Sequence, residues 1–206
     1  HRPPVPLSPP TIFLVDDDPS VLRGLSRLLR SAGWSSATFS SAEDFLNCLD
    51  PAASGCVVLD LSLPKVNGLE LQRKLSEKGC LLPIIFLTGH GDVPTTVQAM
   101  KAGAVDFLTK PVLDEELLEA VRIAVEEDRV RRSQRAEKAA IEERLATLTP
   151  REREVFLGVI SGKLNKQIAV DLGTVEKTIK VHRARVMEKM GADSLAELVR
   201  IAGKAG

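Results

Sequence analysis

Residues 56–60 read CVVLD, and residues 83–88 read PIIFLT. Each stretch is a continuous apolar run, without the polar alternation of a strand that has one face in water. Strands of this kind are covered on both faces, which is typical of parallel sheets flanked by helices. Each run also ends on a polar residue, Asp60 in the first and Thr88 in the second. These two stretches therefore indicate the fold class and point to one edge of the sheet as a functional site.

Similar runs alternate with segments of helical period along residues 11–127. The expected strands are residues 11–15, 38–39, 56–59, 83–87 and 105–108, and the expected helices are residues 20–32, 42–49, 68–78, 94–102 and 114–127. This alternation predicts an α/β domain with a five-stranded, parallel, doubly wound sheet of the flavodoxin-like type. Residues 1–10 hold five prolines and are expected to form a flexible leader.

The pattern changes after the first domain. Residues 128–146 contain no Gly or Pro and are rich in Glu, Arg and Ala, which predicts a long helical linker. Short apolar-periodic segments separated by glycines follow in residues 147–206. They predict a second, all-α domain with helices at 150–161, 166–172, 175–190 and 195–202, the first of which opens on the capping box Thr149–Glu152.

Composition excludes several classes of protein. With 44% apolar and 27% charged residues in 206, the chain is neither disordered nor fibrous. No apolar run approaches the roughly 20 residues that cross a bilayer, so no membrane association is expected. The cysteines Cys48, Cys56 and Cys80 form no CxxC pair, and we expect them to be buried, reduced thiols in a cytoplasmic protein.

Charge is distributed unevenly although its sum is zero. Residues 1–121 carry 10 basic and 15 acidic side chains, a net charge of −5, whereas residues 122–206 carry 18 and 13, a net charge of +5. Different partners are therefore expected for the two halves, with nucleic acid the natural partner of the basic one.

Acidic residues stand where two expected strands end. Asp16 and Asp17 follow the run FLV, and Asp60 follows VVL. Ligands of open parallel sheets bind outside the carboxyl ends of the strands, so these acids are expected to converge there. Carboxylates suit a hard cation such as Mg²⁺. We expect Asp16 and Asp17 to hold the metal and Asp18, which precedes a proline, to cap a helix.

The other polar residues at the ends of the expected strands can be assigned roles at this site. Asp60, isolated among apolar residues, is the candidate nucleophile toward a phosphoryl group. Thr88 and Lys110, each at the end of a later strand, are expected to contact and neutralise the transferred oxygens.

The blocks VDDDPSV, VVLDLSLPKVNG and FLTGHGDVPTTVQAMKAGAVDFLTKP resemble the receiver domain of two-component response regulators over residues 11–127. HGDVP and MKAGA are most similar to the FixJ-like subfamily. The resemblance implies that a sensor histidine kinase phosphorylates Asp60, and that Asp16, Asp17, Asp60 and the carbonyl of Ser62 bind Mg²⁺. It also implies a switch pair formed by Thr88 and Phe107, and homodimerisation of phosphorylated receivers through residues 94–108.

One helix of the second domain combines an apolar stripe with a basic face. At 100° per residue, the expected core-facing stripe holds Val175, Ile179, Val186 and Met190. The residues expected on the other side are Lys177, Lys180, Val181, Ala184 and Met187, with Arg183 at the border. Preceded by a short helix and a tight turn, this is the pattern of a helix-turn-helix recognition element.

Residues 148–199 are similar to the LuxR-type four-helix DNA-binding domain, from LTPREREVF to SLAELV. The resemblance makes residues 166–172 the support helix, residues 175–190 the recognition helix and the last helix a dimerisation surface. It implies promoter DNA and RNA polymerase as partners, and regulation of transcription by activation. The DNA contacts expected are Lys166, Lys177, Lys180, Val181, Arg183 and Ala184, whereas His182 is expected to be a buried structural residue.

Two other functions remain open at this point. A haloacid dehalogenase-type phosphatase also uses a carboxylate and Mg²⁺ at strand ends, but it needs a second aspartate two residues after the nucleophile, where this chain has Ser62. An orphan regulator whose receiver no longer accepts phosphate would use the first domain only for interaction. The complete set of Asp, Thr and Lys residues argues against this second alternative.

Overall fold

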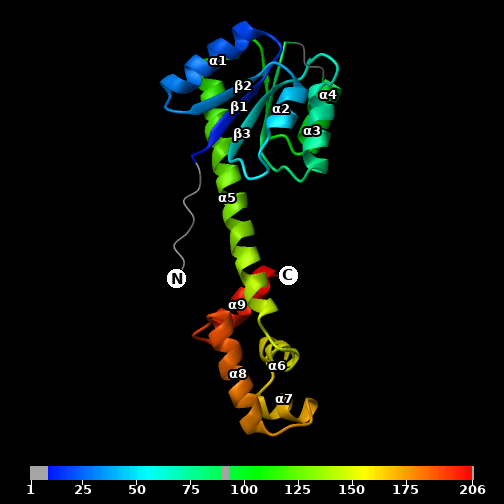
Figure 1. The fold of residues 1–206 in the computed structure, drawn as a ribbon, viewed down its shortest axis with the longest axis vertical. Coiled ribbons are helices and arrows are strands. Elements are labelled where there is room, and N and C mark those ends of the chain that lie inside the picture. The colour runs from blue at the N-terminus through cyan, green and yellow to red at the C-terminus, as the bar shows by residue number, and fades with distance from the viewer. Residues whose placement is uncertain (1–8, 90–92, 206) are drawn as a thin grey trace. The chain divides into compact units, whose positions relative to one another are not determined.

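The computed structural model describes residues 9–89 and 93–205 (Figure 1). The chain divides into two compact units, the first ending at Arg131 and the second beginning at Arg132, and each is described here by itself. Most of the expected leader, residues 1–8, lies outside the described residues, as do residues 90–92 of the HGDVP block.

The first unit contains the expected parallel sheet. Its strands are β1 (Thr11–Val15), β2 (Ser35–Phe39), β3 (Gly55–Asp60), β4 (Ile84–Thr88) and β5 (Asp106–Thr109). They lie in the order β2-β1-β3-β4-β5, and every neighbouring pair is parallel, as predicted. β2 is longer than the two residues expected, because its serines pair with β1 at the edge of the sheet and carry no apolar signal.

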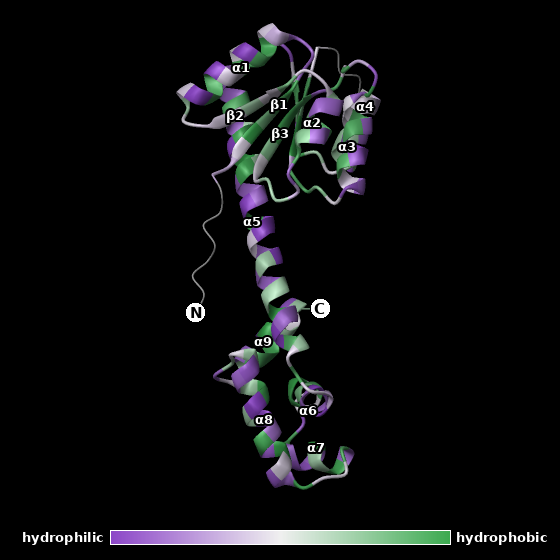
Figure 2. Cartoon of the chain, viewed as in Figure 1, coloured by the Kyte–Doolittle hydropathy of each residue, from purple (hydrophilic) through white to green (hydrophobic). Residues whose placement is uncertain are grey.

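Helices cover both faces of this sheet (Figure 1). One face packs against α1 (Pro19–Ser31) and the first turns of α5 (Asp114–Ala146). The other packs against α2 (Ala42–Cys48), α3 (Gly68–Glu77) and α4 (Val93–Lys101). Figure 2 shows hydrophobic residues concentrated on the strands, while the helices alternate between hydrophobic and hydrophilic residues. The apolar runs of β3 and β4 are therefore buried on both sides, which confirms the doubly wound fold.

The entry to β3 is held by a residue of α5. The amide of Gly55 donates to Asp128 Oδ2 over 3.0 Å, and Asp128 is only 3% exposed. Burial, with a smaller contribution from the charge of Asp128, raises the pKa of the neighbouring Cys56 thiol to about 12. Asp128, expected in the linker, thus forms part of the packing of the first unit.

The cysteines and the single tryptophan lie in different environments. Cys56 is buried and Cys80 is partly buried, but Cys48 is exposed, so the expectation of three buried thiols was wrong for Cys48. Cys48 is the last residue of α2, whose inward positions are occupied by Ala42 and Phe45. Trp34 is partly buried against the core on the α1 side, and its amide donates to the Leu29 carbonyl over 2.9 Å.

The second unit contains the end of α5 and the four expected short helices. These are α6 (Pro150–Ile160), α7 (Asn165–Asp171), α8 (Glu176–Met190) and α9 (Leu195–Ala205). The capping box of Thr149 and Glu152 is present at the start of α6. α5 is one continuous helix of 33 residues, but neither it nor any other described helix is both long and apolar enough to span a membrane.

Two positions of the expected recognition helix, residues 175–190, differ from the structure. Val175 is 65% exposed rather than buried, because it is the extended N-cap and the helical spacing begins only at Glu176. Met187, expected on the outer side, packs partly against the core. Ile179, Val186 and Met190 are fully buried, as predicted.

Two glycines of the first unit allow a stability prediction. Gly55 has φ +129°, and a Cβ there would stand 1.9 Å from the Thr11 carbonyl oxygen, whereas Gly33 has φ +84° and open space around it. Gly33→Ala is expected to cost about 1 kcal/mol from backbone strain alone. Gly55→Ala adds a backbone clash and is expected to cost at least about 3 kcal/mol. Denaturant unfolding of both variants measures the difference, and equal losses would contradict it.

Candidate functional site

The carboxylates expected at the strand ends do come together. Asp16 follows β1 and Asp60 ends β3, and these residues are only 2% and 6% exposed. Asp17 is exposed beside them. One carboxylate oxygen from each of the three lies within 4.8 Å of the others. Neighbouring parallel strands therefore deliver three acidic groups to one point, as predicted.

Lys110 bridges the two buried carboxylates. Its Nζ donates to Asp16 Oδ2 over 2.6 Å and to Asp60 Oδ2 over 2.9 Å. Partial burial of the amine favours its neutral form, but the hydrogen bonds to Asp16 and Asp60 outweigh this effect, so the pKa of Lys110 is raised above its usual value. The amine is therefore a permanent positive charge at the site.

Backbone amides fix the other oxygens of these carboxylates. The amide of Asp18 donates to Asp16 Oδ1, and the amide of Ser62 donates to Asp60 Oδ1, each over 2.9 Å. Asp18 itself caps α1 by accepting from the Ser20 amide over 2.7 Å, as expected. Both inner carboxylates are thus held from two sides, by a backbone amide and by the ammonium of Lys110.

Thr88 and Phe107 lie on the neighbouring strands β4 and β5. Thr88 is fully buried at the end of β4, and its carbonyl accepts from the Lys110 amide over 2.7 Å. Phe107 on β5 is half-buried, with its ring centroid 6.1 Å from that of Phe86. The structure therefore brings the expected nucleophile, lysine and threonine to the same edge of the sheet, whereas Phe107 lies two residues before the end of β5, in register with Phe86.

The donor set fits Mg²⁺. Three carboxylates against one ammonium leave a formal charge of −2, and all the available ligand atoms are hard oxygens. Asp16, Asp17 and Asp60 would hold the ion, whose few protein ligands leave room for water and a phosphoryl group.

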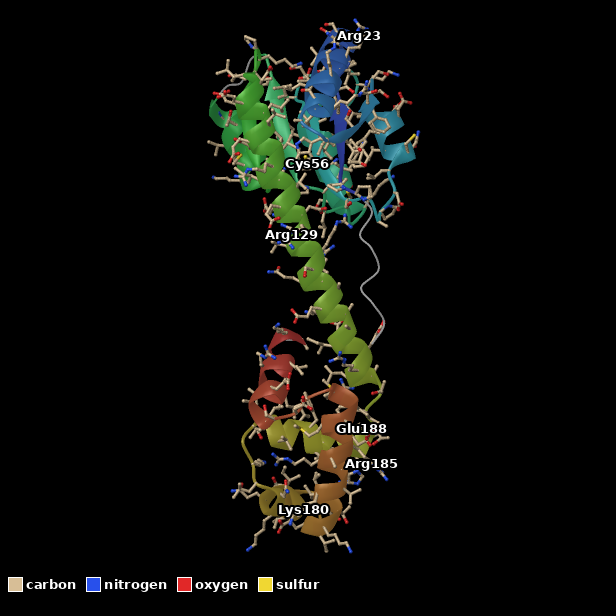
Figure 3. All side chains as sticks on the ribbon, turned by 90° about the vertical axis from the view of Figure 1, so that its left-hand side faces the viewer. Arg23, Cys56, Arg129, Lys180, Arg185 and Glu188 are labelled. Atoms are coloured by element: carbon tan, nitrogen blue, oxygen red, sulfur yellow. The ribbon has the colours of Figure 1, made fainter. Side chains whose placement is uncertain are left out.

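The second unit exposes the basic face expected on α8. Lys177, Lys180, Val181 and Ala184 are all exposed. Lys180 forms an ion pair with Glu176 over 3.3 Å, and both side chains remain solvent-accessible. Figure 3 labels Lys180 and also Arg185, an exposed cation of the same helix that the sequence analysis omitted.

Other residues near α8 have structural contacts. Arg183 Nη1 donates to Asn165 Oδ1 over 3.0 Å, which joins α8 to the start of α7. His182 is half-buried, and its Nδ1 is buried with no hydrogen-bond partner among the described residues. Lys166 is exposed on α7 and lines a hollow of about 380 Å³. The contact of Arg183 with Asn165 was not foreseen, since it joins residues 18 positions apart.

Comparison with known proteins identifies both units. Residues 12–122 match the family described as response regulator receiver domain, and residues 146–202 match the family described as bacterial regulatory proteins, luxR family. The chain is a two-component response regulator. It belongs to the FixJ-like group of these regulators, in which a receiver precedes a LuxR-type DNA-binding domain.

This response regulator has relatives that match almost its whole length. Nodulation protein W of Bradyrhizobium diazoefficiens is 47% identical over 195 residues, which cover 95% of this chain and 86% of that protein. Transcriptional regulatory protein FixJ of the same organism is 43% identical, with 95% of each chain covered. The low-resolution structure of the response regulator StyR is similar with a TM-score of 0.88 and 45% identity, covering 96% of this chain and all of that one.

Membership in this family favours a transcription regulator over the haloacid dehalogenase-type phosphatase. The family consists of transcription regulators rather than classical enzymes, which argues against a phosphatase. The position two residues after the expected nucleophile agrees, because Ser62 carries no carboxylate and its amide donates to Asp60 Oδ1.

Asp60 can be tested in this response regulator by an isosteric change. Asp60→Asn is expected to abolish Mg²⁺-dependent incorporation of phosphate from acetyl phosphate, because an amide is not a nucleophile. Asp18→Asn is the matched control, since asparagine also caps helices well and position 18 is outside the lysine-bridged pair. Phosphate incorporation is measured by intact-protein mass; normal incorporation in the Asp60 variant would place the acceptor elsewhere.

Proposed function

We propose that a sensor histidine kinase phosphorylates this response regulator on Asp60 and that the phosphorylated form binds promoter DNA and activates transcription. The observation that carries the first part is the contact of Lys110 Nζ with both Asp16 and Asp60. It fixes a cation beside Asp60, which is nearly buried and stands alone among apolar residues at the end of β3.

The chemistry assigned to the site is a phosphoryl transfer. A carboxylate oxygen of Asp60 attacks the phosphorus of the phosphohistidine, the P–O bond forms, and the P–N bond to the imidazole breaks. Mg²⁺ bound by Asp16, Asp17, Asp60 and the Ser62 carbonyl would neutralise charge on the transferred oxygens. Lys110 and Thr88 contact those oxygens. Attack by water on the acyl phosphate would then dephosphorylate Asp60 within the same site.

The proposed signal is the charge of the phosphoryl group. It adds about 1.5 to 2 negative charges and three acceptor oxygens beside Thr88. Movement of Thr88 toward these acceptors would vacate space for the ring of Phe107, which packs next to Phe86. Because residue 107 has no hydroxyl, this switch acts through burial of the ring alone.

The exposed face of α8 is the proposed DNA-reading surface, together with Lys166 of α7. Lys180→Ala is expected to weaken binding to operator DNA. If Lys180 contacts a phosphate, its loss lowers the slope of log K against log salt by about one unit without changing specificity. If Lys180 contacts a guanine, its loss costs roughly 1 to 3 kcal/mol of binding free energy at one base position. Lys78→Ala, which changes an exposed lysine at the end of α3 in the first unit, is the control. Salt-dependent titrations measure both variants, and wild-type affinity for Lys180→Ala would exclude this face.

Phosphorylation is proposed to act by pairing receivers through residues 94–108, with α9 as a second pairing surface. Two tethered half-site readers gain about 10²- to 10⁴-fold in avidity without new contacts. RNA polymerase is then the partner that links promoter binding to activation. Because these steps take place on promoter DNA, we propose that the protein acts in the cytoplasm.

Titration of residues 132–206 against half-site and full-site DNA tests this mechanism. The isolated unit is expected to bind a half-site weakly and to gain affinity only on forced dimerisation, because it lacks the receiver. The full chain is expected to gain affinity for the full site with acetyl phosphate. Tight, phosphate-independent binding of DNA by the isolated unit would favour relief of inhibition by the receiver instead. If the DNA affinity of the full chain does not change with acetyl phosphate, the orphan regulator is favoured.

A further inference from the structure

The C-terminal end of α8 is held by residues that lie outside the region of LuxR-type resemblance. Arg144 Nη1, near the end of α5, donates to the carbonyl oxygen of Met190 over 3.0 Å. Met190 is the last residue of α8, so its carbonyl is one of those that a helix leaves without an intrahelical partner. A guanidinium at this end also interacts favourably with the helix dipole.

The next residue makes this approach possible. Gly191 has φ +64°, the left-handed conformation that commonly ends helices, and a Cβ there would stand 3.4 Å from Arg144 Nη1. Glycine at this position therefore allows both the turn of the backbone and the close position of the guanidinium.

A second contact holds the same end of α8 from the α5–α6 junction. Lys189 Nζ donates to the Thr147 carbonyl over 2.9 Å and to Glu152 Oε2 over 2.7 Å. The Glu152 side chain is only 3% exposed, and its Oε2 also accepts from the Thr149 amide over 2.9 Å. Lys189, and after it Thr149, lowers the pKa of the Glu152 carboxyl to about 2, so this partner stays charged.

Apolar packing and a third ion pair extend these contacts along α5. Ile141 is buried and Leu145 is partly buried in the same core as Val186 and Met190 of α8. Glu137 Oε1 accepts from Lys204 Nζ of α9 over 2.5 Å. The last turns of α5 are therefore packed as a fifth helix of the second unit. This unit thus begins before residue 147, where the sequence predicted that the second domain starts.

We infer that Arg144 is a positioning residue for DNA recognition, and that the α5 segment 137–146 is a working part of the DNA-binding domain. This inference rests on the proposed role of α8. The basic face of α8 can meet base edges only if the helix is held at a fixed angle on its supports. Arg183 with Asn165 holds α8 to α7, and Arg144 holds its C-terminal end.

Operator titrations of the phosphorylated full chain test this role. Arg144→Ala is expected to lower affinity about tenfold, the effect of losing a hydrogen bond to a charged group. The slope of log K against log salt is expected to stay unchanged, because Arg144 does not touch phosphate. Arg144→Lys, which keeps the charge and a donor, is expected to recover part of the loss.

Arg135→Ala is the matched control, because Arg135 is an exposed arginine of the same helix with no hydrogen bond or ion pair among the described residues. It is expected to bind as the wild type does. Wild-type affinity for Arg144→Ala would overturn the inference. A salt slope reduced by about one unit would also overturn it, because that result indicates a direct phosphate contact.

Two further measurements keep the outcome decisive. If circular dichroism shows that Arg144→Ala does not fold, Arg144→Gln replaces it, because glutamine keeps a donor without the charge. Lowered affinity of Arg144→Gln for the operator then supports the inference, and wild-type affinity refutes it. Lys180→Ala is titrated in parallel. If that variant weakens binding and Arg144→Ala does not, only the positioning role fails, whereas a wild-type chain that binds no DNA removes the proposed function and this inference together.

Discussion

Two nearly buried carboxylates that share one ammonium are the constraint on which the first unit depends. Asp16 and Asp60 would repel each other at this separation, and Lys110 makes their proximity tolerable by contacting both. The three residues come from the ends of three different strands, so they meet only if those strands are parallel and correctly registered. The fold thereby concentrates negative charge at one point, and hard oxygen ligands of this kind suit a divalent cation.

Much of this arrangement could be predicted because it is encoded locally. The apolar runs of β3 and β4 define strands covered on both faces, and the polar residue ending each strand marks the functional edge. The capping box at Thr149 is likewise a short-range signal. Errors arose where tertiary packing overrides periodicity: Val175 lies just outside its helix, Met187 is covered from the side, and Cys48 takes an outward position on a short helix.

Two long-range polar contacts of α5 could not be predicted. The partner of Asp128 is the amide of Gly55, 73 residues away, and the partner of Arg144 is a carbonyl 46 residues away. In the sequence both side chains belong to a run of charges that looks like a solvated spacer. α5 is therefore not one uniform linker. Its start contributes to one core and its end to another, while several of its remaining charges form exposed pairs such as Glu126 with Arg129, which solvent and salt screen.

The position of Trp34 gives the molecule a built-in optical reporter. The chain has one tryptophan and no tyrosine, and Trp34 lies partly buried between α1 and β2 in the first unit. Ultraviolet fluorescence therefore senses the environment of that unit alone. The helical circular dichroism signal, by contrast, receives contributions from both units. Comparing the two signals in the intact, unlabelled chain separates the melting of the phosphate-accepting part from that of the part assigned to DNA.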